Sequence, residues 1–344
     1  MAHPHRRLTI LAAAVGLTVI APLTACGAHS GGSAGFSPSM RPNGTPDLHG
    51  ATIRIAVGAA PAIEDTRIPL IAKILKSWGA KTKIVNQTGD PAAVRVVLSG
   101  DADIASITAS SAINSGLKVF GPSQPRLDYH FMGAPSLKSI KDLPGHIYGT
   151  SNPHGVEALM FADMLKKNNI PVSKVKVTIA GGASVRVSAM LTHHIDATFV
   201  HASDVPRLLK AGFNDLAKMS DAAPELSDSF LVGTSRWTKD NPALATAVDL
   251  AWIKAAQVFN DDEKQWVATA VAYGGGTKSE AAQLYAAFKA ADTFPVKKST
   301  FTAASAQAQE RLAKNVGAIN KTPPLSQWFE TGPWDHATAT LKIA

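Results

Sequence analysis

The feature that most constrains the fold of this chain is an internal repeat with an offset of 93 residues. Shifting the chain by that distance superposes similar residues: Gly89 on Gly182, Val94 on Val187, Leu98 on Leu191, Asp103 on Asp196, Ile107 on Val200, Ala109 on Ala202 and Ser110 on Ser203. Each copy has a glycine-containing loop, a helix, a tight turn with an aspartate, a buried strand and a small polar residue after it. Such a duplication predicts two similar lobes, each built on an open sheet. The alternative is one continuous doubly wound sheet with chance similarity between its halves.

Short apolar runs alternate with amphipathic stretches in both copies, which is typical of an α/β fold. In the first copy we expect strands at 52–57, 83–85 and 104–107, with helices at 63–78 and 91–98. In the second we expect strands at 146–149, 175–179 and 197–200, with helices at 156–167 and 184–191. Ligands of open α/β sheets bind at the carboxyl ends of the strands, where loops and helix N-termini present backbone N–H groups. Two facing lobes would therefore surround one cleft with such loops.

Small polar residues and glycines occupy these loops. The candidate ligand-binding residues are Ala60, Thr108, Ser110, Ser111, Asn152, His154, Gly182, Ser184, His201 and Ser203. Hydroxyls, amides and helix N-termini, without an obvious convergent pair of arginines, suit an oxyanion or a polar neutral ligand. Each hydroxyl or amide could instead be an ordinary helix N-cap, and each histidine could lie on the surface. Arg95 and Arg186 fall inside predicted helices and are interpreted as facing solvent.

The N-terminus has the pattern of an export signal, with a basic patch at residues 3–7, an apolar run at 8–23 and small residues up to Cys26. The run is shorter than the roughly 20 apolar residues that span a bilayer. The stretch LTACG at 23–27 resembles the lipobox of bacterial lipoproteins. This resemblance implies that Cys26, the only cysteine, is lipidated and becomes the first residue after cleavage. A plain secretory signal with an incidental cysteine is the alternative.

Residues 27–48 are rich in Gly, Ser and Pro and predict a flexible tether, with an end-to-end distance of about 25 Å. The remaining chain is long enough for two domains with separate cores, and no later segment reaches transmembrane length. The formal net charge is +8, and it falls to +6 without residues 1–26, which contain Arg6 and Arg7 and no acid. Because the lysines are scattered and not interleaved with aromatics, the charge does not indicate nucleic-acid binding.

Motifs for metals, cofactors and catalysis are weak. His193 and His194 are adjacent, and His201 follows a whole strand later without a metal-ligand spacing, so we expect no metal site. The G-x-S-x-G match at 31–35 lies in the predicted tether and not on a strand-to-helix turn. No nucleophile has a base beside it. The sequence therefore predicts a binding protein without a cofactor, and not an enzyme.

Three segments resemble the nitrate/sulfonate/taurine and thiamine-pyrimidine (NMT1-like) solute-binding proteins. DLPGHIYG at 142–149 is similar to their entry to the second lobe, 191–196 to a turn that ends in aspartate, and 230–242 to the return to the first lobe. The chain departs from the pattern at His193, where the family usually has glycine. The resemblance covers most of 51–270 and implies a type II periplasmic-binding fold that crosses between lobes near 131–136 and 216–220. It places lobe 1 at 49–135 plus 218–344, with the C-terminal helices, and lobe 2 at 136–217.

From this resemblance and the lipobox-like sequence together, we expect an extracytoplasmic, lipid-anchored, monomeric solute-binding protein. It would close about a hinge on a small polar or anionic molecule, such as a sulfonate, a nitrate-like ion or a heterocyclic metabolite, and deliver it to an ABC permease and its ATPase. One alternative is a receptor of a tripartite (TRAP-type) transporter, or a sensor module, of the same fold. Another is an enzyme on this fold, although the pyrimidine-synthesising relatives carry a cysteine-rich motif that this chain lacks. Ligand identity depends on side-chain directions that the sequence does not determine.

Overall fold

The computed structural model describes residues 39–41, 45–151 and 155–344. The predicted signal, Cys26, Asn152 and His154 lie outside the described residues. The last residues of the predicted tether belong to the folded body. Strand β1 (Ser39–Met40) pairs with β2 (Pro46–Asp47), and Leu48 is fully buried. The backbone N–H of Leu48 also donates to the carbonyl of Trp78 at 2.7 Å. The folded body therefore begins before residue 49.

The described residues form two five-stranded mixed sheets, and the first has the order β4-β3-β5-β12-β6. In this sheet β3 pairs in parallel with β4 and β5, whereas β12 is antiparallel to both of its neighbours. The strands are β3 (Thr52–Val57), β4 (Lys81–Asn86), β5 (Ile104–Ile107), β6 (Lys118–Gln124) and β12 (Ser229–Gly233).

The second sheet repeats this arrangement, in the order β9-β8-β10-β7-β11. Here β8 is parallel to β9 and β10, and β7 is antiparallel to its neighbours, as β12 is in the first sheet. The strands are β7 (Tyr129–Gly133), β8 (Ile147–Thr150), β9 (Lys176–Ile179), β10 (Ala197–His201) and β11 (Asn214–Lys218). The predicted pair of α/β lobes is confirmed, and the alternative of one continuous sheet is wrong.

The repeated aspartate has the same structural role in both lobes. In the first, the Asp103 carboxylate accepts the backbone N–H of Arg54 at 2.7 Å, and the Asp103 N–H donates to the Arg54 carbonyl at 2.9 Å. In the second, Asp196 and Ile147 form the same pair of bonds, both at 2.8 Å. The aspartates therefore join β3 to the turn before β5 in the first lobe, and β8 to the turn before β10 in the second, which explains why the pattern recurs at one offset.

The chain leaves the first sheet earlier than the resemblance implied. We expected the first crossing at 131–136, but β7 already pairs with β10 from Tyr129 onward, so the crossing lies between Gln124 and Tyr129. The physical reason is burial, because Phe131 is fully buried in the second lobe with its ring 4.9 Å from that of Phe199. The return lies between β11 and β12, at 219–228, and not at 216–220.

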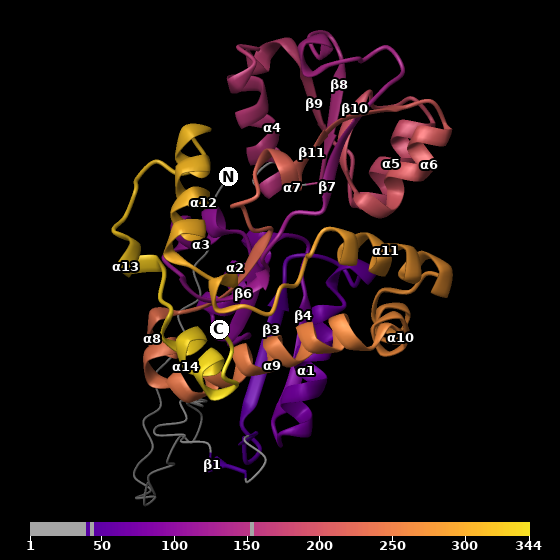
Figure 1. Ribbon diagram of the computed structural model, residues 1–344. Helices are drawn as coiled ribbons and strands as arrows, with labels where there is room; N and C mark the ends of the chain where they lie inside the picture. The colour runs from indigo at the N-terminus through magenta and orange to yellow at the C-terminus, as the bar shows by residue number, and fades with distance from the viewer. Residues whose placement is uncertain (1–38, 42–44, 152–154) are drawn as a thin grey trace, which may run out of the picture. The chain divides into compact units, whose positions relative to one another are not determined.

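Helices cover both sheets. Figure 1 shows α4 on one side of the second sheet and α5 and α6 on the other. The helices of the second sheet's segment are η2 (Ile140–Asp142), α4 (Val156–Lys167), η3 (Val172–Lys174), α5 (Ala183–Leu191), η4 (Ala202–Asp204), α6 (Val205–Lys210) and α7 (Met219–Ala222). The others are η1 (Ile63–Asp65), α1 (Arg67–Ser77), α2 (Asp90–Leu98), α3 (Ala109–Ser115), α8 (Ser235–Asp240), α9 (Pro242–Asp261), α10 (Glu263–Gly274), α11 (Lys278–Ala290), η5 (Lys298–Thr300), α12 (Ala303–Asn315), α13 (Leu325–Trp328) and α14 (Gly332–Thr340).

One C-terminal helix is shared between the lobes. Helix α12 contacts both α3 and α4, and its residues Ala308, Leu312 and Ala313 belong to the core of the second lobe. The prediction placed all C-terminal helices in lobe 1, and α12 packs against the second lobe as well. Across the described ranges, no helix combines the length and apolar character that a membrane crossing requires.

Candidate functional site

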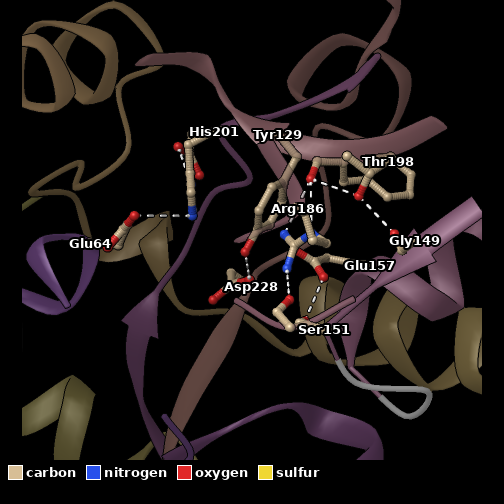
Figure 2. Close-up of polar contacts among 12 residues, drawn as sticks. Glu64, Tyr129, Gly149, Ser151, Glu157, Arg186, Thr198, His201 and Asp228 are labelled. Carbon is tan, nitrogen blue, oxygen red and sulfur yellow. Dashed lines mark hydrogen bonds and ion pairs between the residues drawn. The ribbon is translucent and has the colours of Figure 1, made fainter. Parts of the chain in front are cut away.

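Charged side chains from both lobes meet where the lobes contact each other, and we call this group the inter-lobe junction. It takes residues from η1 and α1 of the first lobe, from both crossing segments, and from α4, α5, the end of β10 and η4 in the second. Figure 2 shows most of them. The members of the junction are Glu64, Arg67, Asp128, Tyr129, Glu157, Arg186, His201, Asp204 and Asp228.

His201 is fixed at the end of β10 and faces the first lobe. Its Nδ1 lies 2.8 Å from an Asp128 carboxylate oxygen, and its Nε2 lies 4.0 Å from a Glu64 carboxylate oxygen across the junction (Figure 2). Burial alone would lower the pKa of His201, but the charge and hydrogen bond of Asp128, with the charge of Glu64, raise it to about 10. The ring is therefore an imidazolium at neutral pH, and it attracts Glu64 of the opposite lobe.

Arg186 does not face solvent, contrary to our expectation, because only 2% of its side chain is exposed. Its partner is Glu157 in the first turn of α4, whose other carboxylate oxygen accepts from the Ser151 hydroxyl at 2.8 Å. The guanidinium also donates to the carbonyls of Gly181, at 2.9 Å, and Phe199, at 3.2 Å. A buried cation of this kind is tolerated because a carboxylate and carbonyls replace its hydration.

Arg67 is the corresponding buried cation of the first lobe, with 4% of its side chain exposed. It lies in the first turn of α1, and its guanidinium spans strand ends of the first sheet. Its acceptors are the Ser123 hydroxyl at 3.0 Å, the Asp65 carboxylate at 3.1 Å, the Glu64 carbonyl at 3.2 Å, the Ser229 hydroxyl at 3.3 Å and the Ser106 hydroxyl at 3.4 Å.

The two crossing segments meet at Tyr129 and Asp228. The Tyr129 hydroxyl donates to the Asp228 carboxylate at 3.2 Å, so the start of β7 is tied to the residue before β12. Burial raises the pKa of Asp228 to about 6, although the positive charge of Arg67 opposes the shift. Negative charge at the junction, from Asp128 and Glu157, adds to the increase.

Three predicted ligand residues, Thr108, Ser110 and Ser111, form a structural cluster. The hydroxyls of Thr108 and Ser111 donate to Asp90 at 2.8 and 2.9 Å, and Thr108 also accepts the N–H of Ser111 as the N-cap of α3. Ser110 is 4% exposed and lies 3.2 Å from the Thr108 hydroxyl. The N-cap interpretation that we weighed against ligand binding therefore describes Thr108.

The other predicted residues are placed at strand and helix ends, as expected. Ala60 is exposed after β3, Gly182 is the N-cap of α5, and Ser184 is exposed in its first turn. Ser203 is half-buried in η4, a turn that contacts α11. Among the described residues of the predicted set, His201 is the one whose side chain belongs to the junction.

The prediction missed most of the junction, although sequence signals exist. The signals lie where the two crossings end. Asp128 directly precedes β7 and Asp228 directly precedes β12, and a polar residue beside an apolar strand is a candidate site residue. Glu157 lies in the first turn of a predicted helix, where an acidic residue could be explained by the helix dipole alone. Its pairing with Arg186, 29 residues later, depends on packing that spacing does not reveal.

No metal centre emerges from the part of the chain that the structure describes, because no three His, Cys, Asp or Glu side chains are grouped to hold an ion.

Solved structures support the fold assignment. The ligand-binding component of an ABC-type import system from Staphylococcus aureus, solved with zinc bound, has a TM-score of 0.66 at 17% identity, over 83% of this chain and 99% of that one. The periplasmic aliphatic sulphonate-binding protein SsuA from Escherichia coli has a TM-score of 0.62 at 17% identity, over 80% and 91%. The periplasmic nitrate-binding protein NrtA from Synechocystis PCC 6803 has a TM-score of 0.68 at 9% identity, over 86% and 90%.

Comparison with curated protein sequences gives no match. The family model described as NMT1/THI5-like matches residues 75–265, which is more than half of the chain and includes both crossings. The two five-stranded sheets of similar topology and the family match both point to the same two-lobed fold. The chain belongs to the NMT1/THI5-like family and has the periplasmic-binding-protein fold.

Proposed function

We propose that this protein is an extracytoplasmic solute-binding lipoprotein that closes its lobes around a small molecule at the inter-lobe junction. The observation that carries the proposal is the Glu64–His201 contact, which brings charged groups of opposite lobes within 4.0 Å. Binding proteins of this fold work by favouring a closed state through ligand contacts from both lobes. Family membership and the solved import components of the same fold support this role.

The junction suits reversible closure because its contacts are polar and partly accessible. The side chain of Glu64 is 26% exposed, so a bound molecule can replace its contact with His201 without opening a hydrophobic core. We also propose that Cys26 carries the lipid anchor and that the partner is an ABC permease with its ATPase. The support for the anchor is the lipobox-like sequence.

Catalysis is less well supported than binding. A general base works best when its pKa lies near the working pH. His201 is held as an imidazolium because its pKa is raised to about 10. The one histidine found at the junction among the described residues is therefore poorly suited to accept a proton at neutral pH.

Native mass spectrometry of the full chain, purified from its own membranes, tests the proposal. We expect the purified protein to retain a small molecule. Partial unfolding and refolding should remove that molecule, and the protein without it should have a lower melting temperature and a larger radius of gyration. Adding the removed fraction back should restore both. A protein that retains no small molecule, and that neither stabilises nor compacts with a small-molecule extract of the host, would contradict the binding function.

A further inference from the structure

We propose that a cavity beside the two crossing segments is a second binding site, which takes a small molecule with at least two negatively charged oxygens. The inference does not depend on the proposed function, because none of the junction residues, all of which the structure describes, lines this cavity. Its volume is about 320 Å³, within the range of about 300–1,000 Å³ that small-molecule sites have.

The walls of the cavity come from both crossings, from the segment around η5 and from the start of α12. Three of these walls are tied together. The Ser227 hydroxyl, in the second crossing, donates to the Pro125 carbonyl of the first at 3.2 Å, and the Gln309 side chain of α12 donates to the Ser227 carbonyl. The side chains of Ser227 and Gln309 are buried. The cavity is therefore bounded by segments that are fixed to one another.

Positive charge predominates among the side chains that line the cavity. The cations are Arg126, Lys297 and Arg311, and the carboxylate is that of Glu225. Because like charges around one hollow repel each other and concentrate their field in it, an anion between them is favoured. Arginine binds phosphate and carboxylate groups through two parallel N–H donors.

These cations are only weakly committed to protein carboxylates. Arg126 and Lys297 share Asp292, at 3.4 and 4.0 Å, and all three side chains are exposed, so the pairs contribute little. Arg311 is exposed, and no carboxylate of the described residues forms an ion pair with it. The two buried arginines of the junction, by contrast, already have protein acceptors for their donors. A multiply charged anion is therefore bound more easily at this cavity than at the junction.

Neutral donors add to the cations at the start of α12. The N-cap Thr302 accepts the N–H of Ser305 at 3.2 Å, whereas the N–H groups of Ala303 and Ala304 have no protein acceptor within the described structure. Ala304 is one of the residues that line the cavity. The positive end of this helix therefore strengthens a site that the three cationic side chains already define.

Calorimetric titration of the full chain with pyrophosphate and with citrate, at constant ionic strength, tests the site. We expect at least one of them to bind, and acetate, with its single charge, to bind much more weakly. Stronger binding of pyrophosphate would assign the natural ligand to the phosphate compounds, and stronger binding of citrate to the polycarboxylates.

Variants locate the binding and test its sign. Arg126→Gln and Arg311→Gln should each weaken binding roughly tenfold or more, because each removes a charge-assisted hydrogen bond. Glu225→Gln should strengthen binding, because it removes the carboxylate that lines the cavity. Arg236→Gln removes an exposed arginine of α8 as a matched control and should leave the affinity unchanged.

The substituted side chains are exposed, so we expect the variants to keep the melting temperature of the wild type. Equal affinity in wild type, Arg126→Gln and Arg311→Gln would show an adventitious ion only and overturn the inference. Failure of both pyrophosphate and citrate to bind would overturn it as well. Either outcome leaves the proposed function standing, because that function is tested by the molecule retained at the junction.

Discussion

At the scale of single residues, the buried carboxyl group of Asp249 is placed unfavourably. It lies in α9 against β6, fully buried, and neither carboxylate oxygen has a hydrogen-bond partner there. Gly121 makes this approach possible, because a Cβ at that position would lie 1.9 Å from an Asp249 oxygen. Burial, and then the negative charge of Glu330, raises the pKa of Asp249 well above its usual value. Burial in the folded protein therefore favours the neutral acid form of Asp249.

We expect Asp249→Asn to stabilise the protein, and more so at higher pH. The unfolded chain releases the Asp249 proton above pH 4, whereas burial makes the folded chain hold that proton to higher pH, so wild-type stability falls as pH rises between the two pKa values. The neutral amide removes this pH-dependent cost, which amounts to about 1.4 kcal/mol per pH unit. Urea unfolding at pH 5 and pH 8 measures the effect, with the exposed Asp335→Asn as control. A stability difference from wild type that is equal at both pH values would refute the assignment.

At the scale of secondary-structure elements, the repeated aspartate gives a matched pair of variants. Asp103→Ala and Asp196→Ala each leave a strand N–H without its acceptor, and we expect a loss of about 1–3 kcal/mol from each. The loss should be larger at Asp103, because its carboxylate also binds the Arg54 guanidinium at 2.8 and 3.0 Å. Asp→Asn at either site keeps an acceptor and should cost less. Chemical denaturation of the four variants measures these differences, and no loss at Asp196 would contradict the repeat's structural role.

Most helices and parallel strands could be predicted from the sequence, because apolar periodicity and the 93-residue offset report local structure. The antiparallel strands β7 and β12 could not be placed, since their partners are chosen by long-range burial. The departure at His193 has a clear physical reason. This residue has φ 57°, in the left-handed region that favours the glycine usual in the family, and its ring stacks on Phe213 at 5.8 Å.

The candidate site was harder to predict, because its members are defined by partners distant in sequence. Thr108 and Ser111 were selected as strand-end hydroxyls, but their direction is set by Asp90. Arg186 was correctly predicted to lie on a helix, but it was wrongly predicted to face solvent. Its buried partner, Glu157, comes from another helix of the same lobe, which the sequence spacing does not reveal. Strand ends thus identify where a site is, whereas charge pairing decides which side chains remain for a ligand.

At the scale of the whole molecule, the lobes are joined by more than the two crossing segments. Helix α12 packs on both lobes, and α11 contacts η1 of the first lobe and η4 of the second. The Phe288 ring on α11 and the His201 ring lie with their centroids 6.5 Å apart, at a steep angle to each other. His201 therefore lies close to groups on both sides of the junction, and we expect its charge to affect closure as well as stability.

We expect stability and closure to be lost together as the pH rises from 7 to above 10. Because Asp128 and Glu64 raise the pKa of His201 from 6.5 to about 10, its contribution is complete below pH 6.5 and disappears as the pH passes 10. Glu157 also raises the pKa of His201, whereas Asp228, with a pKa of about 6, has already ionised at pH 7.

His201→Gln should remove about 3 kcal/mol of stability at pH 7, as expected for breaking a buried ion pair. Melting temperature and radius of gyration from pH 7 to 10.5 measure both effects, and the variant should change much less than wild type. If the two proteins lose stability in parallel, the titration belongs to lysines or tyrosines elsewhere, and the charge of His201 does not hold the lobes together.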